Sequence, residues 1–319
     1  MDRITSPFGA DTTARELAAG HDLTGRTVIV TGAATGIGVE TARALAEVGA
    51  DVVIAARKPD LAQAAVDDIA KTAKGKVSWE MLDLSSLDSV REFARRWGER
   101  PLHILINNAG VMACPPAYTK DGLEMQIGTN HFGHYLLAVL LAPALEAGAK
   151  DAGKPSRVVS LSSIGHRRSG VNFDDPHFRN RPYDKWEAYG QAKTANSLFA
   201  VAFDERFKDR GIRANAVMPG GIMTPLQRHM SQEEMQAMGW INEKGELRQG
   251  FKTPEQGAST SVWAAIGDEL EGKGGLYLEN CAQAVPWNAD QPWAGVMPHA
   301  LDKAAADRLW ALSQETTGA

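Results

Sequence analysis

The stretch Thr31-Gly-Ala-Ala-Thr-Gly-Ile-Gly38 decides the fold. It follows a β-branched run at 26–31 and precedes a stretch at 38–48 whose apolar residues have helical spacing. Strand, glycine turn and helix in this order predict the first unit of a parallel α/β sheet. The glycines let the backbone turn tightly and approach a pyrophosphate, whose charge the N–H groups of the helix stabilise. The spacing is G-x-x-x-G-x-G, and an ordinary tight turn is the alternative interpretation.

The same alternation continues along the chain. Strands are expected at 26–31, 51–56, 77–82, 102–106, 157–161, 212–217 and 275–278, and helices at 38–48, 61–69, 122–145 and 187–207. With right-handed crossovers, this predicts a Rossmann-type, doubly wound α/β fold: a mainly parallel seven-stranded sheet with helices on both faces. Residues 1–24 are interpreted as an N-terminal arm with a short helix near 13–19. Residues 25–319 are interpreted as a single dinucleotide-binding catalytic domain.

Two irregular segments, 164–185 and 221–251, follow the carboxyl ends of expected strands. Open α/β sheets bind ligands at that edge, so both segments are predicted to line the substrate site. The segment at 221–251 is the predicted substrate loop.

Composition excludes several classes of protein. The 319 residues are 44% hydrophobic and 23% charged, which is ordinary for a globular protein and not for a disordered chain or a collagen. The formal net charge is −5 and there is no basic stripe, so no nucleic-acid partner is expected. Two cysteines, Cys114 and Cys281, cannot form a disulfide framework and suit a reducing, cytoplasmic location. The longest apolar run, 136–145, is shorter than the ~20 residues that span a bilayer.

The end of the second strand indicates the type of dinucleotide. An NAD-preferring site places an acid there to bind the ribose 2′-OH. Here Arg57 and Lys58 follow the strand instead, and these cations suit a 2′-phosphate. NADP(H) is therefore predicted over NAD(H), with a merely solvated Arg57 as the alternative.

Tyr189 and Lys193 are four residues apart on an expected helix and so share a face. An ammonium near a phenol is expected to lower its pKa, which suits Tyr189 to general acid/base chemistry. The alternative is an exposed aromatic residue beside an exposed lysine. Ser162 and Ser163 end the fifth strand, where only one of two neighbours faces the ligand. Such a serine either orients a carbonyl or merely caps a turn.

Asn130 lies inside an expected helix although asparagine is a poor helix former. A group inserted into the helical hydrogen bonds would explain it, and a tolerated polar residue is the alternative. The neighbouring His131 and His134 have no Cys, Asp or Glu at ligand spacing. They are interpreted as packing residues, and no metal site is expected.

Taken together, these motifs resemble the short-chain dehydrogenase/reductase family over about residues 23–280. The resemblance is carried by the glycine turn, Asn107-Asn-Ala-Gly110, Ser163, Tyr189-x-x-x-Lys193 and Pro219-Gly220. A finer resemblance is to the retinol-dehydrogenase and WW-domain-oxidoreductase branch. It rests on Thr129-Asn-His-Phe-Gly-His-Tyr-Leu136 and Tyr183-Asp-Lys-Trp-Glu-Ala-Tyr-Gly190.

The resemblance implies roles for individual residues. Tyr189 would move the proton, Lys193 would lower its pKa and bind the nicotinamide ribose, and Ser163 would orient the carbonyl. Asn130 would hold a water in a proton path. The expected cofactor-binding set is Gly32, Thr35, Gly36, Ile37, Gly38, Arg57, Asp83, Leu84, Asn108, Ala109, Gly110, Tyr189, Lys193, Pro219, Gly220, Ile222 and Thr224.

The expected function is NADP(H)-dependent hydride transfer between a lipophilic primary or secondary alcohol and its aldehyde or ketone. The pocket is expected from residues 112–116, 164–185 and 221–251, and the assembly as a homodimer or homotetramer. A non-catalytic NADP-sensing regulator is one alternative, disfavoured because Ser163, Tyr189 and Lys193 are all present. A nucleotide-sugar epimerase is the other, disfavoured because few residues follow Thr224.

Overall fold

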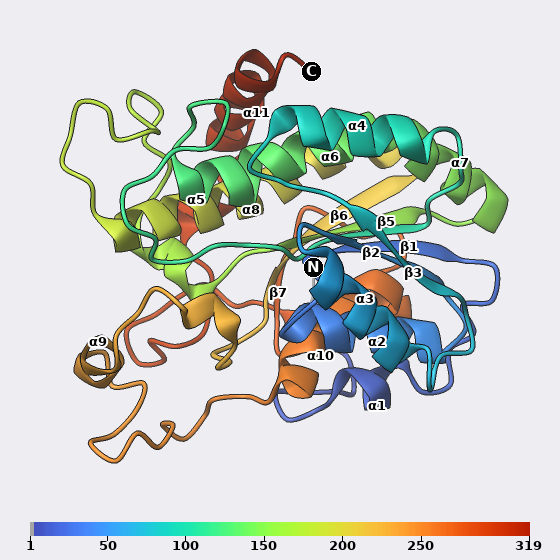
Figure 1. The fold of residues 1–319 in the computed structure, drawn as a ribbon, viewed down its shortest axis with the longest axis horizontal. Coiled ribbons are helices and arrows are strands. Elements are labelled where there is room, and N and C mark those ends of the chain that lie inside the picture. Colours follow the sequence, from blue (N-terminus) through green and yellow to red (C-terminus); the bar gives the residue numbers. More distant parts are fainter. Residues whose placement is uncertain (1–2) are drawn as a thin grey trace.

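One sheet of eight strands runs through the protein, and helices cover both of its faces (Figure 1). The structure is a computed structural model that describes residues 3–319. The strand order is β3-β2-β1-β4-β5-β6-β7-β8. The strands are β1 Thr27–Thr31, β2 Asp51–Ala56, β3 Val77–Met81, β4 Ile104–Asn107, β5 Ser156–Leu161, β6 Ile212–Met218, β7 Tyr277–Glu279 and β8 Ala282–Gln283. The Rossmann-type doubly wound fold is thereby confirmed.

The prediction of seven strands is one strand short. The first seven strands pair in parallel, and β8 pairs antiparallel with β7. Asn280 and Cys281 connect them, and both have a positive φ, 48° and 55°. Two such residues in succession form the tight hairpin connection whose twist matches the strands. A two-residue strand shows no periodicity, so the sequence pattern could not reveal β8.

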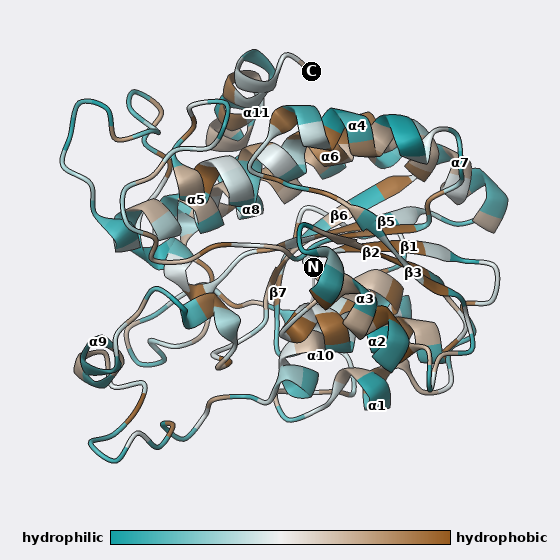
Figure 2. Cartoon of the chain, in the orientation of Figure 1, coloured by the Kyte–Doolittle hydropathy of each residue, from teal (hydrophilic) through white to brown (hydrophobic). Residues whose placement is uncertain are grey.

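The helices divide into two layers. On one face lie α1 Ala14–Ala18, α2 Ile37–Glu47, α3 Pro59–Ile69 and α10 Pro254–Ile266. On the other lie α4 Leu87–Trp97, α6 Gly133–Leu140, α7 Ala142–Ala152, α8 Lys185–Phe207 and α11 Lys303–Thr317. Each layer has its own apolar core against the sheet, and hydrophobic residues are frequent both in the strands and in the helices that cover them (Figure 2). Two further helices, α5 Met125–Ile127 and α9 Gln232–Ala237, lie near the site.

The helix near the N-terminus is α1, as predicted for residues 13–19. The Thr13 hydroxyl accepts from the Glu16 N–H at the start of this helix, and the Glu16 carboxylate accepts from the Thr13 N–H. Leu17 is buried in the same core as α2 and α10. Helix α1 is thus packed against the rest of the chain, and the domain boundary at residue 24 stays a prediction.

The single helix predicted at 122–145 is in fact two helical segments, which meet at a bend at Leu141, and the first of them contains a π-helical turn. A π-helical turn, Gly128–Phe132, separates α5 from α6. The axis then bends by 56° before α7, whose first turn contains Pro143, a residue that cannot continue a preceding helix. Within residues 3–319 no single helix is long and apolar enough to cross a membrane. The bent pair of 125–140 with 142–152 meets the length and composition test.

The interpretation of His131 as a packing residue agrees with its surroundings. Its ring is 2% exposed, and Nε2 lies 2.8 Å from the Ser313 hydroxyl on α11. Burial lowers the pKa of His131 to about 3. The folded protein therefore keeps this imidazole neutral well into the acid range.

Replacement of His131 by Gln should make the stability less sensitive to acid. Between pH 6.5 and 3 the unfolded chain protonates this histidine while the folded chain does not, so stability falls as the pH falls. From pH 7 to 5 this contribution is about 2 kcal/mol, from a loss of about 1.4 kcal/mol per pH unit below 6.5. Urea denaturation at both pH values measures it. The same pH dependence in wild type and His131→Gln would contradict the prediction, and His21→Gln serves as the control.

Candidate active site

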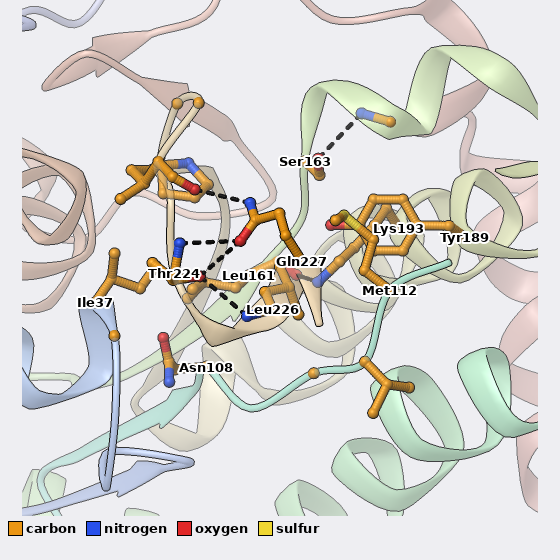
Figure 3. A pocket seen from close by; sticks show the side chains of 18 of the residues that line it. Ile37, Asn108, Met112, Leu161, Ser163, Tyr189, Lys193, Thr224, Leu226 and Gln227 are labelled. Atoms are coloured by element: carbon orange, nitrogen blue, oxygen red, sulfur yellow. Dashed lines mark hydrogen bonds between the residues drawn. The ribbon is translucent and has the colours of Figure 1, made fainter. Parts of the chain in front are cut away.

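A cavity of about 1200 Å³ opens at the carboxyl ends of the parallel strands. It runs from the glycine turn, past Tyr189, to the segments around 221–251 and 287–297. Figure 3 shows Tyr189, Lys193 and Ser163 toward one end and Ile37, Asn108 and Thr224 toward the other. Of the predicted site residues, all line this cavity except Asn130. The structure therefore brings residues from six strand ends into one site.

The glycine turn forms one wall. Gly36 has φ +65° and ends the turn as the N-cap of α2, where no side chain accepts from the helix N–H groups. The first residues of α2 line the cavity, so these free N–H donors and the positive end of the helix dipole lie at its wall. Gly32 is also required, because a Cβ there would lie 2.8 Å from the Cα of Ala109. The wall is thus suited to an anion held close to the backbone.

A buried hydrogen-bond network fixes the strand ends behind this wall. The Thr31 hydroxyl accepts from the backbone N–H of Asn108 at 2.9 Å and of Ala109 at 3.0 Å. Nδ1 of His134 lies 2.9 Å from the Asn130 carbonyl, which can only accept, so Nδ1 carries the proton. Nε2 is then an acceptor, and the Thr31 hydroxyl donates to it at 2.8 Å. Burial lowers the pKa of His134 to about 4, in agreement with a neutral ring.

Asn130 lies in the π-helical turn, so the predicted irregularity of the helix at this residue is confirmed. Its side-chain oxygen accepts from the Val111 N–H at 2.8 Å, and its amide nitrogen donates to the Val111 carbonyl at 2.9 Å. A Cβ on Gly110 would lie 3.3 Å from that side-chain oxygen and 3.7 Å from the Lys193 Nζ. Asn130 therefore stands directly behind the cavity wall, close to Lys193.

Tyr189 and Lys193 lie in the first turns of α8, where Asp184 accepts from the N–H groups of Trp186 and Glu187. Each side chain is only 5% exposed. Nζ of Lys193 donates to the Leu161 carbonyl at 2.9 Å and lies 5.6 Å from the centre of the Tyr189 ring. The shared helix face predicted from the spacing of four residues thus places both groups at the end of β5.

Burial controls the ionisation of this pair. It raises the pKa of Tyr189 to about 12, against an opposing hydrogen bond with Ser163, and lowers the pKa of Lys193 to about 8. The predicted lowering of the Tyr189 pKa is therefore wrong for this structure. The sequence argument counted the lysine charge but not the loss of hydration. At neutral pH the phenol holds its proton and Lys193 is mainly an ammonium.

The two serines at the end of β5 have different surroundings, as strand alternation predicted. Ser162 is 2% exposed, donates to the Lys193 carbonyl at 2.8 Å and accepts from Ser197 at 2.9 Å. The Ser163 hydroxyl accepts from the Gly165 N–H at 3.1 Å (Figure 3). A Cβ on Gly165 would lie 2.8 Å from the Tyr189 ring, so this turn packs directly against the phenol. Ser163 is the serine beside Tyr189.

Arg57 lies at the far end of the cavity, directly after β2. Its side chain is 56% exposed and lies 4.0 Å from the Asp83 carboxylate. Asp83 is in turn bound by the Ser85 hydroxyl at 2.6 Å. Lys58 also lines the cavity, so two cations stand at the strand end where the sequence shows no acid.

The lining also includes residues that the sequence analysis missed. Trp287, Trp293 and Met297 come from the segment after β8 and line the end of the cavity beyond Tyr189. In the sequence, the one feature that could have drawn attention to this segment is the presence of two tryptophans in a polar, proline-containing stretch. Nothing local to that stretch indicates that it returns to the active site.

Comparison with known proteins agrees with this geometry. The family model for short chain dehydrogenase matches residues 26–235. The chain belongs to the short-chain dehydrogenase/reductase family. The resemblance noted from the motifs is thereby confirmed, and the chain is an oxidoreductase of the CH–OH group with NAD(P) as partner.

Individual relatives narrow the branch. The chain is 47% identical over 302 residues to a "probable oxidoreductase" of Streptomyces lividans, covering 93% of this chain and 99% of the relative. It is 39% identical over 304 residues to retinol dehydrogenase 13 of Homo sapiens, covering 92% and 85%. A crystal structure of a Mycobacterium Paratuberculosis protein superposes with a TM-score of 0.73 at 34% identity, covering 97% and 98%. The family member described here thus lies in the retinol-dehydrogenase-like branch.

The residues fit the NAD(P) that the family binds. The uncapped start of α2 suits the diphosphate, and the left-handed Gly36 lets the backbone approach it. A Cβ on Gly36 would meet the Thr224 side chain at 3.4 Å, so the glycine turn packs closely against the loop after β6. The chemistry that NAD(P) supplies when bound is hydride transfer.

Ser163→Ala should lower mainly the catalytic rate, whereas Ser162→Ala should lower mainly the stability. We expect Ser163→Ala to lower kcat by about 10²–10³-fold, as for loss of one donor to a reacting oxygen, with a small loss of stability from the missing hydrogen bond to the Gly165 N–H. Ser162→Ala should instead cost about 1–3 kcal/mol of stability, because it leaves buried partners unsatisfied. Steady-state kinetics and thermal denaturation of both variants provide the test. A large loss of kcat in Ser162→Ala, together with a nearly normal kcat in Ser163→Ala, would show that Ser162 is the catalytic serine.

Proposed function

We propose that this protein is an NADP(H)-preferring oxidoreductase that interconverts a lipophilic primary or secondary alcohol and its aldehyde or ketone. The observation that carries the proposal is the continuity of one cavity. It joins the glycine turn to Ser163 and Tyr189 and then continues into an apolar region. A panel of ketones and aldehydes, assayed with NADPH and with NADH through nicotinamide absorbance, tests it.

Tyr189 is proposed as the general acid in the reductive direction. Its phenol is protonated at neutral pH, because burial raises its pKa to about 12. It would give that proton to the substrate oxygen as the hydride arrives at carbon, while Ser163 donates a hydrogen bond to the same oxygen. The reverse transfer applies in oxidation.

Lys193 and Asn130 are proposed to support Tyr189. The Lys193 ammonium, 5.6 Å from the ring centre, stabilises the phenolate that remains after proton transfer. The Asn130 side chain forms two hydrogen bonds with the Val111 backbone, and the Asn130 backbone carbonyl accepts a hydrogen bond from His134. A carbonyl oxygen has two lone pairs, so the proposed water in the proton path would use the second one.

The preference for NADP(H) rests on Arg57 and Lys58. A guanidinium presents planar, charge-assisted donors that match phosphate oxygens. Arg57 is exposed to the cavity and only weakly engaged with Asp83, at 4.0 Å. It is therefore available for a 2′-phosphate. The other expected cofactor-binding residues are proposed to line the remainder of the same site.

The lipophilic substrate is inferred from the cluster beside Tyr189, referred to below as the apolar lobe. Met112, Ala113 and Tyr189 are buried there, with Trp186, Leu226, Met230 and Trp240 packed against them. The aromatic rings of Trp186 and Trp240 lie 6.1 Å apart. Thioether and indole side chains of this kind bind apolar ligands of varied shape.

The other interpretations are less well supported. A regulator that only senses NADP would not need Ser163 and Tyr189 packed against one another, and turnover on the panel separates the two. For an epimerase, the residues after Thr224 would have to form a sugar-binding domain. Within residues 3–319 they add α10, β7, β8 and α11 to the same fold. The cytoplasmic location and the homodimer or homotetramer stay predictions.

Tyr189→Phe should abolish most turnover and spare cofactor binding. The hydroxyl carries the proton, whereas the ring still packs against Gly165. The expected loss in kcat is about 10²–10⁴-fold, and the Kd for NADPH, measured by fluorescence, should change little. Turnover within a few-fold of the wild-type rate would remove Tyr189 from the proposed chemistry.

Arg57→Ala should weaken the use of NADPH and leave that of NADH nearly unchanged. Loss of a charge-assisted hydrogen bond costs about 1.5–3 kcal/mol, which corresponds to about 10- to 150-fold in KM. Lys58 is close enough in sequence to keep part of the contact, so Arg57→Ala/Lys58→Ala should lose more. Equal use of both cofactors by the unmodified protein would show that the 2′ position is not recognised.

A further inference from the structure

The cavity is lined by basic side chains along its whole length. Among residues 3–319 its lining contains one acid, Asp83, beside eight basic residues: Arg57, Lys58, Arg167, Arg168, Lys193, Arg228, Arg248 and Lys252. This contrasts with the chain as a whole, whose formal net charge is −5. Arg57 and Lys58 belong to the adenosine end, and Lys193 accompanies Tyr189. The remaining cations need another explanation.

Two of them, Arg168 and Arg248, lie against the tryptophans at the apolar end. The guanidinium of Arg168 lies 5.2 Å from the Trp186 ring centre, and that ring is 6.4 Å from Tyr189. The guanidinium of Arg248 lies 4.6 Å from the Trp293 ring centre, and its backbone N–H donates to the Trp240 carbonyl at 2.8 Å. Stacking on an indole holds a guanidinium in place while its N–H edge stays free.

Neither arginine has a carboxylate partner within 4 Å in the described part of the chain. Two carboxylates contact Trp186, and both have other partners. Glu234 pairs with Lys185 at 2.7 Å and accepts from the Trp186 indole N–H at 3.0 Å, and Asp184 accepts from the backbone N–H groups of Trp186 and Glu187. The charges of Arg168 and Arg248 are thus uncompensated at the edge of the apolar lobe.

We propose that the substrate is an amphipathic anion, whose apolar body packs in the lobe while Arg168 and Arg248 hold its carboxylate or phosphate group. The reacting carbonyl or carbinol lies at Tyr189, and the anionic group lies beyond Trp186. Planar guanidinium donors match both kinds of oxyanion. This inference rests on the proposed function, because it names the class of substrate for the same site.

A binding experiment tests the proposal without turnover. Isothermal titration of the NADPH-loaded enzyme compares dodecanoate and dodecyl phosphate with methyl dodecanoate, which has the same chain and no charge. At least one anion should bind about tenfold or more tightly than the ester, the gain expected for one charge-assisted hydrogen bond. The tighter of the two anions identifies the headgroup. The advantage should shrink between 0.05 M and 0.5 M NaCl, because salt screens exposed charges.

The double variant Arg168→Gln/Arg248→Gln should lose that advantage and keep the ester affinity. Arg95→Gln is the matched control, because Arg95 is exposed on α4 and outside the cavity lining. The KM for NADPH should be the same in wild type and double variant, which separates an anion site for substrate from one for cofactor phosphates. Equal affinities for anions and ester in the wild type, or an anion preference that survives the double substitution, would overturn the proposal.

Turnover separates this inference from the function on which it rests. Reduction of 12-oxododecanoate is compared with that of its methyl ester, and kcat/KM should favour the acid about tenfold in the wild type only. Turnover of both at equal kcat/KM would overturn the anion site and leave the oxidoreductase function intact. Failure to reduce any aldehyde or ketone, with the anion preference in binding retained, would count against the proposed function alone.

Discussion

The arrangement of the active site depends on the hydrogen bonds of the Thr31 hydroxyl. It accepts from the N–H groups of Asn108 and Ala109 and donates to His134, which in turn donates to the Asn130 carbonyl. One oxygen atom therefore links the end of β1, the loop after β4 and the π-helical turn. Along this series of hydrogen bonds, His134 donates from Nδ1 and accepts at Nε2. Only a neutral imidazole can do both. Burial supplies the neutrality, because it lowers the pKa of His134 to about 4.

Burial has a different consequence at Tyr189 and Lys193. Both side chains are almost fully covered, and loss of hydration disfavours the charged form of each. The phenol is thereby kept protonated, and the lysine pKa lies near 8. A proton donor that is protonated at neutral pH, next to a cation that stabilises its conjugate base, is suited to reduction of a carbonyl. The fold achieves this by placing the pair at the start of α8, under the end of β5.

The two ends of the cavity use arginine in different ways. At the end proposed to bind adenosine, Arg57 follows β2 directly, and its position is set by the sheet. At the end proposed to bind the substrate, Arg168 and Arg248 come from irregular segments, and tryptophan rings support them. Leu226, Met230 and Trp240 of the irregular segment 221–251 complete the apolar lobe beside Tyr189.

The sequence by itself determined the positions of the first seven strands along the chain, the glycine turn and the grouping of Tyr189 with Lys193. These features depend on local spacing, and the parallel sheet then brings all strand ends to one edge. Only the tertiary structure decided which long-range partners those residues meet. It showed that β8 forms, because two positive-φ residues make a hairpin that has no periodic signal. It divided the predicted helix at 122–145 by a bend of 56° before α7, whose first turn contains Pro143. It also reversed the predicted pKa shift of Tyr189, because desolvation depends on which distant segments cover the side chain. It brought Trp287 and Trp293 to the pocket, because the path of the segment after β8 depends on long-range packing.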